Sequence, residues 1–287
     1  MHGDIAALER RVEQGNDGFL SKPVNTHIAA EWGQLSTLQW LRERMCPWDE
    51  ETCRRAAFRG HLEVLKYAHE HGCPWDSFSC QRAALRGNLD VLKYLHDNGC
   101  PWDEYTCQNA AKGGHLHVLR YAREHGCPWN EWTCRAAAEG GHIRVLKYAH
   151  ENGCPWDAGF RMCYFAAEGG HVDVLKYLHE SGCEWDEGTC QAAAREGHLD
   201  VLKYAHENGC PSDSVACLAA AEGGEVDVLL WAVSHGLPFD CDKCLDALKL
   251  QLTPASHADL GDWLRSKAPP LSPHAFRRLR FDDEIEI

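Results

Sequence analysis

Cysteine and histidine are the residues of this chain whose types and spacing could do chemistry, since both bind zinc and paired thiols form disulfides. The sequence has 16 cysteines and 18 histidines among its 287 residues. Fifteen of the cysteines fall into two columns with a repeating step. The first column is Cys46, Cys73, Cys100, Cys127, Cys154, Cys183 and Cys210. The second column is Cys53, Cys80, Cys107, Cys134, Cys163, Cys190, Cys217 and Cys244.

This spacing favours a structural role for the thiols over chemistry. Zinc sites use tight pairs such as Cys-x2-4-Cys, which bring four ligands together tetrahedrally, whereas the two columns here are joined by Cys-x6-Cys. The second-column cysteine falls at an expected core position of a helix, where a thiol packs as a small apolar group. Disulfides and a metal site remain open alternatives. Cys241 and Cys244 form the one Cys-x2-Cys pair in the sequence, which we interpret as part of a terminal cap because it lacks a βαβ context.

The histidines also form columns that suit helix ends better than catalysis. One column begins a helix and the other lies near the end of that helix, where imidazole interacts well with unpaired carbonyls and the helix dipole. The first comprises His61, His115, His142, His171 and His198, and the second comprises His69, His96, His150, His179 and His206. The Gly-Gly pairs lack the spacing and lysine of a phosphate loop, and no nucleophile–base pattern is present. We therefore expect no enzyme activity, no catalytic residue, no bound metal and no cofactor.

The elements that position these columns can be read from one unit, Cys100–Gly126. Asp103 is a good N-cap for a short first helix over 106–112, which the glycines ending at Gly114 stop. A second helix over 115–125 carries an apolar stripe at helical spacing and ends at Gly126. The same sequence motif recurs every 27 residues, with a two-residue insertion between Cys154 and Cys163. A period of this length indicates an array of stacked helix pairs.

The repeated run Ala-Ala-x-x-Gly-His-Leu-x-Val-Leu-Lys-Tyr-x-x-x-x-Gly resembles the ankyrin repeat, and it covers about residues 3–240. The resemblance implies an all-α, ankyrin-like helical-repeat solenoid of about nine helix pairs. The Thr-Pro-Leu-His motif of the family is absent and the repeat is shorter than usual, so short turns are expected where ankyrins place a β-hairpin. The short Cys-Pro-Trp-Asp repeats also resemble those of large arrays in giant viruses of amoebae and in some algae.

We expect three segments along the chain. Residues 1–240 form the ankyrin-like array, which begins inside a repeat. Residues 241–268 form a C-terminal capping helix pair, and residues 269–287 form a tail with a basic and an acidic half. Along the array, Trp75, Trp102, Trp129, Trp156 and Trp185 recur unchanged, so each is expected to bury most of its ring between adjacent helix pairs.

Composition restricts the class of partner. A net charge of −14 argues against nucleic acid, because phosphate binding needs a basic stripe that no recurring face provides. No apolar run approaches the length that spans a bilayer, and the N-terminus lacks a signal-peptide core. We therefore expect a monomer in the cytoplasm without membrane contact. For a virus-encoded chain this would be the host cytoplasm.

The resemblance implies a non-catalytic scaffold that binds a protein partner on its concave face. Alternatives are a substrate-recruiting adaptor for a ubiquitin ligase, although no F-box-like module is evident, and a thiol redox or metal-binding protein.

Exposed columns that vary between repeats are the candidate binding residues, because packing fixes the others. The column expected at the tips of the first helices comprises Glu51, Phe78, Tyr105, Trp132, Phe160, Gly188 and Val215. Four successive aromatics among them, with arginines alongside, match the composition of interface hot spots. The predicted protein-binding set is Phe78, Tyr105, Trp132, Phe160, Arg161, Tyr164, Phe165, Arg82 and Arg135. The alternative is that these rings merely cover the tryptophan column.

Overall fold

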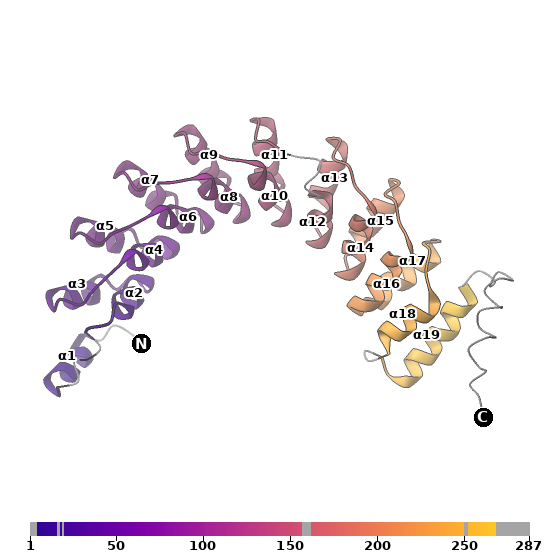
Figure 1. Cartoon of the computed structure of the whole chain (residues 1–287), viewed down its shortest axis with the longest axis horizontal. Helices are drawn as coiled ribbons and strands as arrows, with labels where there is room; N and C mark the ends of the chain where they lie inside the picture. Colours follow the sequence, from indigo (N-terminus) through magenta and orange to yellow (C-terminus); the bar gives the residue numbers. More distant parts are fainter. Residues whose placement is uncertain (1–4, 16–17, 19, 157–161, 250–251, 268–287) are drawn as a thin grey trace, which may run out of the picture. The chain divides into compact units, whose positions relative to one another are not determined.

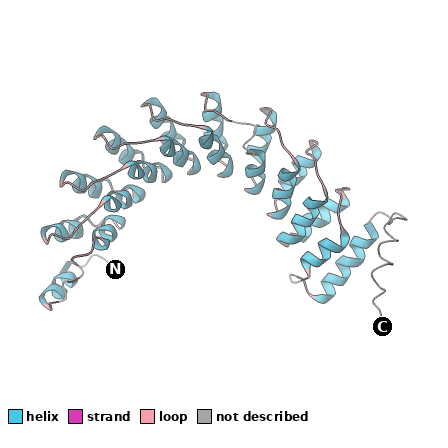
Figure 2. Ribbon diagram, in the orientation of Figure 1, coloured by secondary structure: helices cyan, strands magenta, loops and turns pink. Residues whose placement is uncertain are grey.

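The structure of the chain is a computed structural model, which describes residues 5–15, 18, 20–156, 162–249 and 252–267 (Figure 1). Every regular element in the described residues is an α-helix, and none of these residues lies in a strand (Figure 2). Within the described residues the helices form α1 followed by nine pairs, which confirms the predicted all-α repeat fold.

The helices of a pair are called here the first and the second helix of a repeat. The first helices are α2 (Val24–Glu31), α4 (Glu50–Arg59), α6 (Ser77–Leu85), α8 (Glu104–Lys112), α10 (Glu131–Glu139), α12 (Met162–Glu168), α14 (Glu187–Arg195), α16 (Ser214–Gly223) and α18 (Cys241–Leu248). The second helices are α3 (Leu35–Glu43), α5 (Leu62–Glu70), α7 (Leu89–Asp97), α9 (Leu116–Glu124), α11 (Ile143–Glu151), α13 (Val172–Glu180), α15 (Leu199–Glu207), α17 (Val226–Ser234) and α19 (Pro254–Lys267). The unpaired helix α1 spans Ile5–Glu13.

The chain divides into two compact units. The first comprises residues 1–162 with 176–183, and the second comprises residues 163–175 with 184–287. Each unit contains helix pairs of the same kind. The helices α18 and α19 lie in the segment predicted as the C-terminal cap.

Local chemistry explains where the helices begin and end. In α4 the N-cap Asp49 has extended backbone, and its carboxylate accepts a hydrogen bond from the Glu51 N–H at 3.1 Å. The same helix ends at Gly60, which has a left-handed φ of 80°. In the predicted unit α8 begins after Asp103 and Gly126 adopts a φ of 82°. The Asp103 side chain makes no capping hydrogen bond and instead accepts from Nε2 of Gln81 at 3.0 Å.

Small buried side chains bring the first helices together. The alanine pairs, such as Ala110 and Ala111, are fully buried, as is the neighbouring Cys107. In the first unit α4, α6, α8 and α10 pack against one another along much of their length, whereas the second helices α5, α7, α9 and α11 touch only briefly. The row of first helices therefore lies on the inner side of the curve within this unit (Figure 1).

The glycine that ends each first helix also accommodates the next repeat. At Gly87 the φ is 74°, and a Cβ there would lie 2.6 Å from Nδ1 of His115. Nε2 of His115 lies 3.2 Å from the Leu85 carbonyl oxygen, close to the end of the preceding first helix. This histidine column therefore joins adjacent repeats by binding carbonyls at helix C-termini.

The tryptophan column lies in the connections between repeats and is half-buried, outside the fully buried core. Trp75 stacks on His69 with the ring centroids 3.6 Å apart, and it meets Tyr94 of the next second helix edge-on at 6.2 Å. Where arginine replaces this histidine, the guanidinium of Arg123 lies 4.1 Å from the Trp129 ring centroid. The second histidine column thus packs on tryptophan as part of the structure.

Candidate protein-interaction surface

Three aromatic side chains occupy the same position in three successive first helices of the first unit. They are Phe78 in α6, Tyr105 in α8 and Trp132 in α10, and we call them the aromatic row. Their exposed fractions are 52%, 53% and 38%. The following two residues of each helix, such as Thr106 and Cys107, point into the core, so helical geometry turns the preceding side chain toward solvent.

The aromatic row is confined to part of the array. One repeat earlier, in α4, the same position holds Glu51. In the second unit it holds Gly188, which is buried, and Val215, which is 39% exposed. Large exposed rings at this position are therefore not a requirement of the repeat fold.

Arginines lie against the rings at both ends of the row. The guanidinium of Arg54 is 5.0 Å from the Phe78 centroid, and that of Arg135 is 4.6 Å from the Trp132 centroid. Arg54 donates from Nε to Oδ1 of Asp76 at 3.0 Å, and this pairing raises the pKa of the guanidinium. Each guanidinium is thus held by an acidic residue and lies within cation–π distance of a ring that remains exposed.

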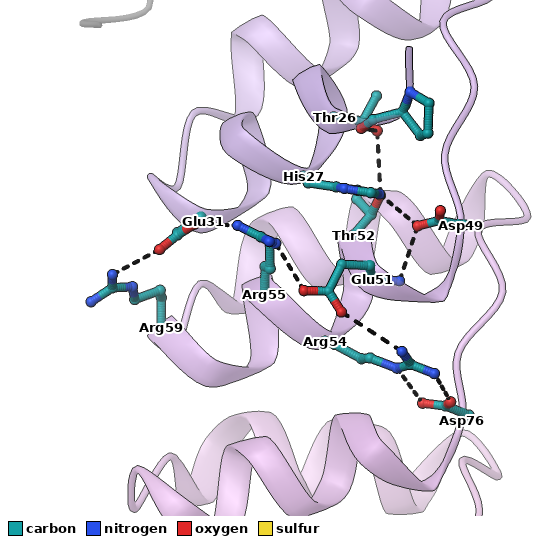
Figure 3. A network of polar contacts seen from close by, with 11 residues as sticks. Thr26, His27, Glu31, Asp49, Glu51, Thr52, Arg54, Arg55, Arg59 and Asp76 are labelled. Atoms are coloured by element: carbon teal, nitrogen blue, oxygen red, sulfur yellow. Dashed lines mark hydrogen bonds and ion pairs between the residues drawn. The ribbon is translucent and has the colours of Figure 1, made fainter.

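An ion-pair network fills the inner surface on the α2 side of the row (Figure 3). Arg55 bridges Glu31 at 2.6 Å and Glu51 at 2.9 Å, while Arg59 pairs with Glu31 at 2.8 Å. The hydrogen bond from Arg59, followed by that from Arg55, lowers the pKa of Glu31. These charges satisfy one another within the protein.

A small groove adjoins Trp132. It has a volume of about 110 Å³ and is lined by Gln108, Trp132, Arg135, Ala136 and Glu139. Glu139 accepts from Nε of Arg135 at 2.7 Å. The volume is below that of small-molecule sites and is of the size that one partner side chain occupies.

The remaining predicted residues are distributed differently. Arg82 lies over Phe58 of the preceding repeat, 5.9 Å from its centroid, and not over Phe78. Tyr164 and Phe165 belong to the second unit, where their rings meet edge-on at 5.4 Å.

Phe160 and Arg161 lie outside the described residues. Counting back from Cys163 places Arg161, and not Phe160, at the position of Trp132. The fourth aromatic of the predicted tip column is therefore out of register by one residue.

Sequence reasoning missed Arg54 and Phe58 as neighbours of the predicted site. Arg54 is separated from Phe78 by nearly a whole repeat, so the contact is evident only when adjacent repeats are superposed. The sequence does carry one signal for this contact, because Arg54 and Asp76 have the same spacing as Gln81 and Asp103. Gln81 donates to Asp103 at 3.0 Å, as Arg54 donates to Asp76.

The cysteine thiols lie in surroundings typical of structural residues. Every cysteine except Cys241 is buried, and Sγ of Cys127 lies 3.2 Å from the Asp103 carbonyl oxygen. Burial raises the pKa of Cys217 to about 12 and that of Cys244 to about 11. Thiols held protonated in this way are poor nucleophiles and poor metal ligands. Among the described residues, no group of three or more His, Cys, Asp or Glu side chains could hold a metal ion.

The described part of the chain contains no helix that is long and apolar enough to cross a membrane.

Comparison with known proteins agrees with this architecture. The family of ankyrin repeats (many copies) matches residues 53–96 and 133–179. Among solved structures, the crystal structure of the human ASB11 ankyrin repeat domain is similar, with 21% identity and a TM-score of 0.50. That match covers 62% of this chain and 96% of the other. A comparison with curated proteins gave no match.

Ankyrin repeats are in general protein–protein interaction modules, and their fold is typical of non-enzymatic scaffolds. The recurring Gly-His columns, the strand-free helix pairs and both comparisons lead to one assignment. Residues 53–96 and 133–179 are ankyrin repeats, and the described helix pairs have the ankyrin repeat fold.

Proposed function

We propose that this protein is a non-catalytic, cytoplasmic scaffold that binds a protein partner on the inner surface of its first unit. The aromatic row of Phe78, Tyr105 and Trp132 anchors the partner, and Arg54 and Arg135 flank it. The single observation that carries this proposal is the exposure of three rings at equivalent positions of consecutive first helices.

Physical chemistry supports a protein partner for this surface. Tyrosine, tryptophan and arginine dominate interface hot spots because they bury a large area and retain a polar group. Arg54 and Arg135 are already held by Asp76 and Glu139, so little side-chain entropy is lost when a partner covers them. The groove beside Trp132 provides space for one partner side chain.

The direct test is partner capture by the immobilised full chain and by a triple variant, Phe78→Ser, Tyr105→Ser and Trp132→Ser. We expect the triple variant to lose the partner that the unaltered protein captures stoichiometrically, while its thermal midpoint remains close to that of the unaltered protein. Trp32→Ser is the matched control, because Trp32 is also an exposed aromatic of the first unit but lies outside the row. A folded triple variant that still captures the same partner contradicts the proposal.

The adaptor and thiol alternatives have less support. An adaptor would need a module that binds the ubiquitin ligase, and no such module is evident in the sequence. The C-terminal tail over 269–287 lies outside the described residues. Thiol chemistry would need accessible thiolates, whereas every cysteine except Cys241 is buried and burial raises the pKa of Cys217 and Cys244.

A further inference from the structure

The second helices carry a charge pattern that changes in two adjacent repeats. Five regular repeats place an acidic residue in the first turn of the second helix. These residues are Glu63, Asp90, Asp173, Asp200 and Asp227. In α9 and α11 the corresponding residues are His117 and Arg144. Both side chains are exposed, so core packing does not account for the exchange.

The exchanged residues line one groove between α9 and α11, here called the basic groove. Its lining is Gly114, Leu116, His117, Arg120 and Arg144, and its volume is about 330 Å³. Neither Arg120 nor Arg144 forms an ion pair with another residue in the described part of the chain. Arg120 lies over the Tyr148 ring at 5.2 Å, a contact that leaves its N–H groups able to donate.

The surroundings of the groove reinforce its positive potential. The helices α9 and α11 both begin at it, so the positive ends of two helix dipoles face the same region. Burial lowers the pKa of the adjacent His115, and the nearby His117 and His142 lower it further. The chain as a whole has a net charge of −14, so this groove is a local exception.

The preceding repeat provides a groove of similar shape and different charge. It has a volume of about 390 Å³, and its lining includes Gly87, Leu89, Asp90 and His117. Asp90 there occupies the position that His117 holds in the next repeat. The groove itself is thus a general consequence of the repeat, whereas the concentration of cationic groups is specific to α9 and α11.

We propose that the basic groove binds a phosphomonoester dianion. Two guanidinium groups line the groove from two helices, and a phosphoryl group offers several oxygens that can accept from both. The His117 imidazole lies beside them, with its Nε2 3.2 Å from the Gly87 carbonyl oxygen. A single carboxylate would satisfy one guanidinium and leave the other without an anion. The site lies on the row of second helices and is independent of the aromatic row.

The test follows backbone amide signals of the full chain by NMR at low ionic strength, where charges are weakly screened. The probes are inorganic phosphate, the peptide Gly-Gly-phosphoserine-Gly-Gly, and the same peptide with glutamate in place of phosphoserine. We expect both phosphate probes to shift the signals of His117 and Arg144. If the phosphopeptide binds more tightly, the source is a phosphorylated protein, and if inorganic phosphate binds at least as tightly, the source is a free phosphate compound.

Two double variants distinguish phosphate binding in the basic groove from general electrostatic attraction to the protein. Changing His117→Asp and Arg144→Asp installs the kind of residue that other repeats carry, and it should weaken phosphate binding roughly tenfold or more. The matched control, Lys66→Asp with Lys93→Asp, removes positive charge from α5 and α7 and should change affinity less than about twofold.

Three results would overturn the proposal. One is the absence of any shift at about 10 mM phosphate, a weak limit for binding. Another is an equal loss of affinity in the control, and the third is equal binding of the glutamate peptide.

Discussion

The two compact units share their buried positions and differ at their exposed ones. Leu119 in the first unit and Leu202 in the second are both fully buried, as are Cys107 and Cys190. The contacts between repeats are also alike. Nε2 of Gln81 donates to Asp103 at 3.0 Å in the first unit, and Gln191 donates to Asp213 at 3.1 Å in the second.

The exposed first-helix position is where the units diverge, because Tyr105 in the first unit corresponds to Gly188 in the second. Repeats are held by buried columns and neighbour contacts, so the exposed columns are free to vary. Under the proposed function, recognition would therefore be concentrated in the first unit, and the second unit would contribute mainly the scaffold.

Equal packing in the two units is the first part of this comparison to test. Leu119→Ala in the first unit and Leu202→Ala in the second should each lower the free energy of unfolding by about 3 kcal/mol, because both delete a buried side chain. Chemical denaturation of the two variants measures the loss. Unequal losses, differing by more than about 1.5 kcal/mol, would show that the buried columns are not equivalent.

Two glycines of similar backbone conformation test how much the contacts between repeats contribute to stability. Gly114→Ala should cost about 2–3 kcal/mol, because a Cβ there would lie 2.6 Å from Nδ1 of His142 in addition to the left-handed φ of 75°. Gly126→Ala should cost only about 1 kcal/mol, since φ is 82° but no atom lies within 4 Å. Equal losses in thermal and chemical denaturation would mean that the histidine contact contributes nothing.

Thiol burial predicts a stability that decreases in alkaline solution. The pKa of Cys217 rises from 9.0 to about 12 on folding, so its contribution is complete below pH 9.0 and is lost as pH rises toward 12. The free energy of unfolding should decrease by up to about 1.4 kcal/mol per pH unit for this thiol. Cys217→Ala should reduce that slope, measured by denaturation in reductant between about pH 8 and pH 10. An unchanged slope would show that the thiol is accessible to solvent in the folded state.

The smallest expected effect concerns buried hydroxyls in the first helices. Oγ1 of Thr106 is buried and has no hydrogen-bond partner, and Met162 and Ala216 occupy the same position in other repeats. Thr106→Val should therefore raise the free energy of unfolding by up to about 1 kcal/mol. Thr26→Val is the opposite case, because its Oγ1 donates to the Pro23 carbonyl at 2.7 Å and the variant should be destabilised. The account of these hydroxyls would be wrong if both variants moved in the same direction.

Much of the fold could be predicted from the sequence because its signals are local. Asp103 before a short helix and Gly126 after the second helix fixed the element boundaries, and the recurring cysteines fixed the register. The partner of His115 was not predictable, since the Leu85 carbonyl lies in the preceding repeat. The tryptophans were expected between helix pairs, and Trp75 does lie between His69 and Tyr94 of adjacent second helices, but its stacking on histidine was not predicted.

The candidate site was predictable in part for the same reason. The exposure of Phe78 and Tyr105 follows from their place beside core residues of the same helix. The Arg54 guanidinium and the basic groove at Arg144 depend on contacts between repeats, which a single repeat does not reveal. No recurring face of the sequence carries a basic stripe, and the basic groove is consistent with that because its cationic residues occur in only two adjacent repeats.

Photo-crosslinking from equivalent positions of the two units tests the central claim most directly. A benzoylphenylalanine side chain is placed at Tyr105 in one variant and at Val215 in another, both of which are exposed first-helix positions. Each variant is incubated with the captured partner and irradiated. The account predicts a covalent adduct with the partner from position 105 and none from position 215. An adduct from position 215 without one from position 105 would contradict it.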